Sequence, residues 1–125
     1  MIIRSNNPYF LLNRAACEDN RLSYTAIGLH TYLMSKPDNI GISEVDLESI
    51  HTDDVNLIRS AIDELLRLGY MHRTQFIKNG NVVYYEASIF ETPDDNPYFD
   101  GIVIQKGETI PFTIVNIDEI QVQYE

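Results

Sequence analysis

The sequence has little that could cross-link the chain, anchor it in a membrane or export it. Cys17 is the only cysteine in 125 residues, so no internal disulfide can form, which fits a reducing cytoplasm. Cys17 follows two alanines and is expected to be a small buried hydrophobic residue. No window approaches the ~20 consecutive apolar residues of a membrane span. Asn6, Asn7 and Pro8 interrupt any signal-peptide core. We therefore expect a cytoplasmic protein without a membrane partner.

Signatures of catalysis and of metal binding are also missing. The chain contains no G-x-S-x-G, no glycine-rich phosphate loop and no H-E-x-x-H motif. His51 and His72 flank a predicted helix without cysteine or acidic partners at metal-ligand spacing. The acids that begin at Asp94 do not fit a calcium loop, because Tyr98 and Gln105 occupy its fifth and twelfth positions. We expect no enzyme activity, no cofactor and no metal.

Basic residues are scarce. Nine Lys and Arg oppose 19 Asp and Glu, which gives a formal net charge of −10. Residues 1–92 contain eight bases and twelve acids, a net charge of −4, whereas residues 93–125 contain Lys106 and seven acids, a net charge of −6. An acidic chain repels nucleic acid unless its basic residues gather on one face. The position of the few cations therefore decides which partners are compatible with the chain.

Apolar spacing predicts a first helix from Ser23 to about Ser35. Apolar residues recur there every three or four positions, and Ser23 is a suitable N-cap. Pro37 ends the helix because it disfavours helical backbone in the residue before it. His30 lies on the apolar face and is expected to be a partly buried core residue. Gly28 within the helix suggests close packing against a neighbouring element.

Two further helices and a hairpin are expected in residues 43–91. The second helix covers 43–50, and the third is capped by Thr52 or Asp53, runs to Leu68 and stops at Gly69. Two β-rich runs, 70–77 and 82–90, then flank Lys-Asn-Gly-Asn, and Asn-Gly is a strong hairpin signal.

The tail is predicted to be a separate β-rich extension. Residues 92–97 are typical of a linker, and the runs 101–104 and 110–115 flank a Gly-containing turn, which predicts a second hairpin. Residues 117–124 are a candidate third strand. So small a sheet is marginal by itself, and it must pack on the first part of the chain or on a second copy.

The order of these elements and several local motifs resemble a known family. The chain is similar to the amino-terminal winged-helix domain of phage and plasmid replication initiators and of DnaD-like replisome organisers, over roughly its first three quarters. The resemblance implies DNA binding in replication initiation or transcriptional control. It is carried by the following residues: Arg21-Leu22-Ser23, Ala26, Gly28-Leu29, Leu33, Ser35-Lys36-Pro37-Asp38, Ile58-Arg59, Ala61, Glu64-Leu65, Gly69-Tyr70 and Arg73.

If the third helix enters the major groove, the outward residues near its start are the ones that reach base edges. Asparagine and arginine carry the bidentate groups that suit adenine and guanine. The candidates in the helix are Asn56, Arg59 and Ser60. The candidates for phosphate contacts from the hairpin are Arg73, Gln75, Lys78, Asn79 and Asn81.

Aromatic residues supply a second set of candidates. The chain has eight Tyr and no Trp, and exposed aromatic side chains are enriched at protein interfaces. Tyr84 and Tyr85 are adjacent in a predicted strand, so one of them must point outward. Tyr98 and Phe99 follow the linker. Ordinary cross-strand packing is the alternative for each of these residues.

The predicted fold is α+β, with a three-helix winged helix in residues 1–92 and an acidic β-rich extension in residues 93–125. The first functional hypothesis is a DNA-binding protein of mobile-element type that acts as a homodimer on double-stranded DNA. Dimerisation is expected because the tail strands otherwise leave an unpaired edge. The alternative is an acidic interaction module or inhibitor that uses the same scaffold to bind a basic protein.

Overall fold

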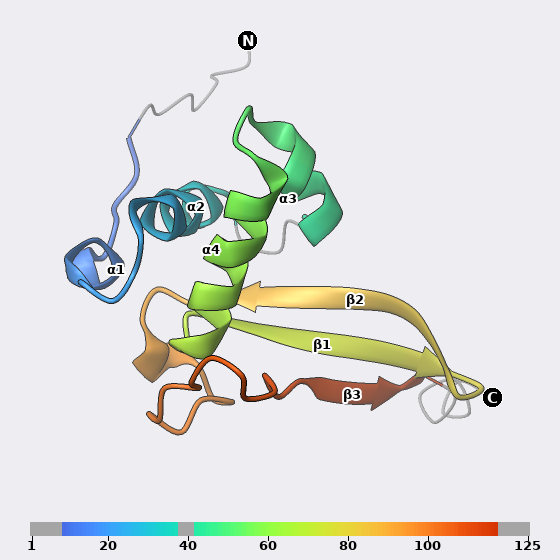
Figure 1. The fold of residues 1–125 in the computed structure, drawn as a ribbon. Helices are drawn as coiled ribbons and strands as arrows, with labels where there is room; N and C mark the ends of the chain where they lie inside the picture. Colours follow the sequence, from blue (N-terminus) through green and yellow to red (C-terminus); the bar gives the residue numbers. More distant parts are fainter. Residues whose placement is uncertain (1–8, 38–41, 118–125) are drawn as a thin grey trace, which may run out of the picture.

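The computed structural model describes residues 9–37 and 42–117 (Figure 1). These residues form an α+β fold in which the helices lie together at one end of an open three-stranded sheet. The elements are α1 (Arg14–Glu18), α2 (Tyr24–Met34), α3 (Glu44–Ile50), α4 (Val55–Arg67), β1 (Met71–Lys78), β2 (Asn81–Ile89), a 3-10 turn η1 (Pro93–Asp95) and β3 (Thr113–Asn116). No helix among the described residues is long and apolar enough to cross a bilayer.

Polar caps set where the helices begin. Ser23 and Ser43 accept hydrogen bonds from backbone amides three residues later, which starts α2 and α3 as predicted. Asp54 caps α4, one residue later than predicted, by accepting from the amide of Asn56 at 2.7 Å. The short helix α1 was not predicted, and Asn13 caps it in the same way.

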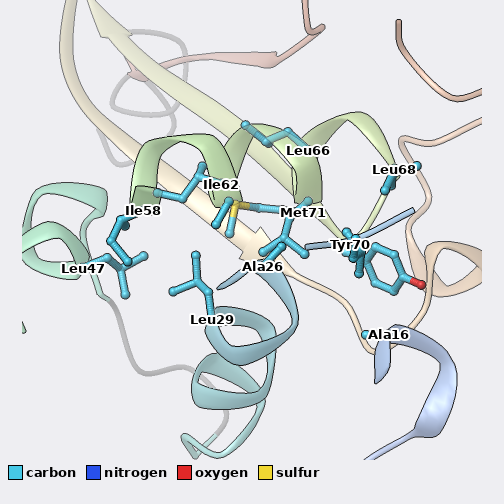
Figure 2. Close-up of a cluster of buried hydrophobic side chains, with 13 residues drawn as sticks. Ala16, Ala26, Leu29, Leu47, Ile58, Ile62, Leu66, Leu68, Tyr70 and Met71 are labelled. Carbon is cyan, nitrogen blue, oxygen red and sulfur yellow. The ribbon is translucent and has the colours of Figure 1, made fainter. Parts of the chain in front are cut away.

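The core lies between α2, α4 and the start of β1 (Figure 2). The stripe of α4 that faces it includes Ile58, Ala61, Ile62 and Leu65, all buried, as the spacing predicts. Removing a side chain such as Leu65 from water contributes about 1.5–3 kcal/mol. Burial of this stripe therefore fixes which face of α4 points away from the core.

Strands β1 and β2 form the predicted antiparallel hairpin. Asn79 and Gly80 occupy its turn with φ of 52° and 78°, the left-handed pair that an Asn-Gly turn favours. Met71 pairs with Ile89 at the base, and the register shifts between Phe76 and Ile77. Figure 1 shows the hairpin reaching well beyond the helices, so its outer half has no helix packed against it.

The tail does not form the predicted second hairpin. Residues 101–104 are not a strand, and β3 instead pairs in parallel with β1, from Thr74 against Thr113 to Ile77 against Asn116. The sheet order is β2-β1-β3. The backbone of β1 thus supplies hydrogen-bonding partners that a second tail strand was expected to supply. The candidate third strand lies outside the described residues after Ile117.

Before reaching β3, residues 96–108, called the strap here, pack on the end of α4. The buried Asn96 donates its side-chain N–H to the Gly69 carbonyl at 2.9 Å. The Ile104 amide donates to the Arg67 carbonyl at 3.1 Å, and the Arg67 guanidinium donates to the Glu108 carbonyl at 3.0 Å. These bonds join the acidic extension to the first part of the same chain.

Two local expectations were wrong. Cys17 is exposed, because in the five-residue α1 it is the neighbouring Ala16 that points into the core. Gly28 is not in a close contact, since a Cβ at its position would meet no atom within 4 Å. It borders a shallow hollow between α2, the second half of α3 and the start of α4 instead.

Candidate interaction surface

The three helix residues predicted to reach DNA lie together on an open surface. Asn56, Arg59 and Ser60 are exposed on the side of α4 opposite its buried stripe. Farther along the same helix, the strap binds Arg67. The strap thus covers the end of the outward face and leaves the first half of α4 accessible.

Arg59 is paired with a carboxylate of the preceding helix. Its Nε donates to Glu48 Oε1 at 2.7 Å, and its side chain is 62% exposed. The hydrogen bond from Arg59 holds the pKa of the Glu48 carboxyl below its usual value. The cation at the start of the outward face is therefore matched by an anion that lies beside it.

Arg73 is paired more completely. Its guanidinium makes a two-pronged contact with Glu44, with Nη2–Oε1 at 2.7 Å and Nε–Oε2 at 2.9 Å. Hydrogen bonds to Glu44 raise the pKa of Arg73 above its usual value. Both side chains are partly buried, and the pair connects β1 to the start of α3. Arg73 thus positions α3 against the sheet.

The α3–α4 unit, residues 42–67, is strongly acidic. It holds seven Asp and Glu against Arg59 and Arg67, a net charge of −5. Arg67 pairs with Asp63 at 2.9 Å in addition to holding the strap. Both arginines of the unit therefore have a carboxylate partner. Arg73 of β1 also offsets Glu44, and Lys106 of the strap borders the same hollow as Arg59 and Asp63, so three acidic charges remain in excess. A phosphate backbone approaching this surface would meet a repulsive field.

The predicted hairpin contacts do not converge with those of α4. Lys78, Asn79 and Asn81 lie at the hairpin tip, and Gln75 lies farther back on β1. Figure 1 shows the tip at the opposite end of the hairpin from α4. The structure therefore does not bring Arg59 and Lys78 into one cationic strip.

The outer half of β2 presents an apolar and aromatic surface. Val82, Val83, Tyr84 and Tyr85 are between 41% and 63% exposed. Tyr84 stacks on Phe76 of β1 with ring centroids 4.3 Å apart, whereas Tyr85 points to the other face of the sheet, as alternation requires. We call residues 82–85 the hairpin patch.

The other two aromatic candidates make contacts within the chain. Phe99 of the strap packs directly over Gly69, and Tyr98 stacks on His72 with ring centroids 3.9 Å apart. His72 also hydrogen bonds to the Thr113 hydroxyl at 2.7 Å, and burial lowers the pKa of its imidazole. These contacts help to attach the strap and β3 to the rest of the fold, although Tyr98 keeps about half of its surface exposed (53%).

The histidine of the first predicted helix is more deeply buried than expected. His30 is fully buried, and its Nε2 donates to the Phe90 carbonyl at 2.8 Å while its ring meets Tyr70 edge-on. This bond ties α2 to the end of β2. Among the described residues, no group of three His, Cys, Asp or Glu side chains is arranged to hold a metal.

Sequence reasoning missed the two glutamates that hold the arginines. Glu48 precedes Arg59 by eleven positions and Glu44 precedes Arg73 by 29, so neither pair shows the three- or four-residue spacing of helical ion pairs. The valines of the hairpin patch were also missed, although an uncharged run from 79 to 85 is visible in the sequence.

A comparison with protein-family models gives no match, and comparisons with curated proteins and with solved structures give none either. Function therefore has to follow from the geometry and the charge of the surface itself.

Proposed function

We propose that the chain is a winged-helix module that binds proteins through an acidic α3–α4 face. Helices α2, α3 and α4 correspond to the three helices of such a module, and the β1–β2 hairpin corresponds to its wing. The observation that carries the proposal is the pairing of Arg59 with Glu48 and of Arg67 with Asp63 within a unit of net charge −5. The partner surface expected for this face is basic.

The charges on the α3–α4 face disfavour DNA binding. An exposed ion pair such as Arg59–Glu48 contributes only about 0–1 kcal/mol, so Arg59 can leave Glu48 at little cost. The carboxylate left behind would then face phosphate together with Asp53 and Asp54 at the start of α4. Non-specific DNA affinity comes from cations that neutralise phosphates, and this face supplies no excess of them.

Charge reversal on the face tests the proposal directly. Asp46 and Asp53 are exposed and take part in none of the ion pairs described above. We expect the double variant Asp46→Lys, Asp53→Lys to lose at least 10-fold in the capture of protein partners from nuclease-treated host lysate. Glu18→Lys makes the same kind of charge change on α1, beyond α2 in Figure 1, and should leave capture unchanged.

The same proteins should be titrated against a mixed-sequence duplex by fluorescence anisotropy at ~50 mM salt, where phosphate contacts are strongest. The wild-type chain is expected not to bind. Wild-type binding that is lost on Arg59→Ala would overturn the proposal.

DNA binding in replication initiation or transcriptional control is the second candidate. The observation that favours it is the accessible first half of α4, where Asn56, Arg59 and Ser60 remain uncovered by the strap. Under this reading, Arg59→Ala combined with Lys78→Ala abolishes the anisotropy signal. Lys36→Ala, which removes a cation at the end of α2 that lies over the Tyr32 ring, leaves the signal intact.

A further inference from the structure

Strand β2 has an open edge. The sheet order β2-β1-β3 places β3 along one side of β1 and leaves the outer side of β2, nine residues long, without a strand beside it among the described residues. Every second residue of an edge strand presents its backbone N–H and C=O groups outward, which makes the edge a template for another strand.

Among the described residues, the usual protection of an edge strand is missing from the outer half of β2. From residue 79 to 85 there is no charge and no proline, and the side chains of the hairpin patch are exposed. Proteins normally place charges, prolines or covering segments along such an edge to prevent pairing. At the base of the hairpin, Ala87 and Ile89 pack against the core, so the exposed apolar side chains of β2 are confined to its outer half.

Charge indicates what occupies this edge. Two chains of net charge −10 repel each other over most of their surfaces, and the uncharged patch is where two such chains can approach. An antiparallel pair centred on Val83 sets residues 81–85 of one copy against residues 85–81 of the other, so neither paired segment carries a charge.

We propose that two copies of this chain join through their β2 edges, antiparallel and related by a twofold axis at Val83. The two sheets then form one continuous sheet of six strands, with the hairpin patches in contact at its centre. A twofold interface uses the same patch on both copies. The inference deepens the proposed function, in which the chain binds proteins, and gives a dimer with two acidic faces.

A charge at the centre of the interface provides the test. In Val83→Lys, two lysines face each other across the twofold axis, and like charges directly opposite in a sheet are destabilising. By sedimentation equilibrium we expect the wild-type chain to be a dimer and Val83→Lys to dissociate at least 10-fold more readily. Ile114→Lys, at an exposed position of β3 on the opposite edge of the sheet, is the matched control and should remain dimeric. Circular dichroism checks that both variants are folded.

Cross-linking tests the register. In a Cys17→Ser background, Val83→Cys should form a disulfide between copies on mild oxidation, whereas Ile114→Cys should not. A wild-type monomer at ~100 µM, a level that saturates micromolar dimers, overturns the proposal, as does equal dissociation by both lysine variants. The proposed function can fail separately: a monomer that still captures a protein through the acidic face overturns only the dimer, and a dimer that binds duplex DNA overturns only the proposed function.

Discussion

At the scale of single residues, Gly69 is the position where adding a side chain is expected to be most destabilising. Its φ is +88°, and a Cβ added there would lie 2.5 Å from Cδ2 of Phe99. The left-handed backbone costs a non-glycine residue about 1–2 kcal/mol, and the clash with the strap adds to that cost. We expect Gly69→Ala to lower the free energy of unfolding by at least about 2 kcal/mol, measured by urea denaturation.

Gly80 offers a matched comparison for this prediction. Its φ is +78°, and nothing lies within 4 Å of a Cβ placed on it. Gly80→Ala therefore carries the backbone cost without the clash. If the two substitutions destabilise the chain equally, Phe99 does not pack on Gly69 as the structure shows.

Asp19 connects the turn after α1 to the core. Its carboxylate accepts from Arg21 Nη2 at 2.7 Å and from the Tyr70 hydroxyl at 2.9 Å, and the hydrogen bonds from Arg21 lower its pKa from 3.8 to about 2. A carboxyl whose pKa is lowered by folding stabilises the fold above the unfolded pKa. We therefore expect this stabilisation to be complete at pH 7 and to be lost as the pH falls from about 4 through 2.

Asp19→Asn isolates that contribution. We expect the substitution to cost about 1–2 kcal/mol at pH 7, the range of hydrogen bonds to charged groups, and the difference from wild type to shrink as the pH approaches 2. Urea denaturation across this pH range measures both. Glu18→Gln, at an exposed neighbouring position, is the control, and a difference that is independent of pH would contradict the assignment.

At the scale of elements, the strap depends on one buried amide. Asn96 donates to the Gly69 carbonyl and accepts from the Tyr98 amide, both at 2.9 Å. Asn96→Ala leaves the carbonyl unsatisfied, which costs about 1–3 kcal/mol. Because the strap is then held less firmly, we expect Asn96→Ala to accelerate hydrogen exchange at the Ile104 amide, which donates to the Arg67 carbonyl. Asn81→Ala, at an exposed position in the hairpin, should leave exchange in the strap unchanged.

Elements with local signals could be predicted from the sequence, and the others could not. The α4 stripe, the Ser23 and Ser43 caps and the Asn-Gly turn are each encoded within a few residues, and the structure has all of them. The parallel pairing of β3 with β1 depends on a segment that first crosses the end of α4. No local pattern distinguishes such a strand from half of a hairpin, so the tail was predicted wrongly.

The candidate surface was predictable only in outline. The outward position of Asn56, Arg59 and Ser60 follows from helical periodicity once the buried stripe is identified. The carboxylates that Arg59 and Arg73 meet depend on how α3 packs against α4 and β1. This tertiary pairing, rather than the position of the cations along the chain, determines the charge of the surface.

At the scale of the whole molecule, net charge and the uncharged patch act against each other. Electrostatic repulsion between two chains of net charge −10 opposes association over a range set by the Debye length, roughly 20 Å at low salt and about 8 Å at physiological ionic strength. Burial of the hairpin patch favours association at any ionic strength. The acidic surface therefore sets how strongly the proposed dimer responds to salt.

Salt consequently affects dimerisation and DNA binding in opposite directions. Raising sodium chloride from about 20 mM to about 300 mM screens the repulsion between copies, so we expect the wild-type dimer to tighten several-fold in sedimentation equilibrium. DNA binding would weaken over the same range, because each phosphate contact releases counterions. In Val83→Lys the patch no longer drives association, so added salt should not restore a wild-type dimer. A wild-type dimer that dissociates as salt rises would mean that charge pairs, rather than the apolar patch, hold the two copies together.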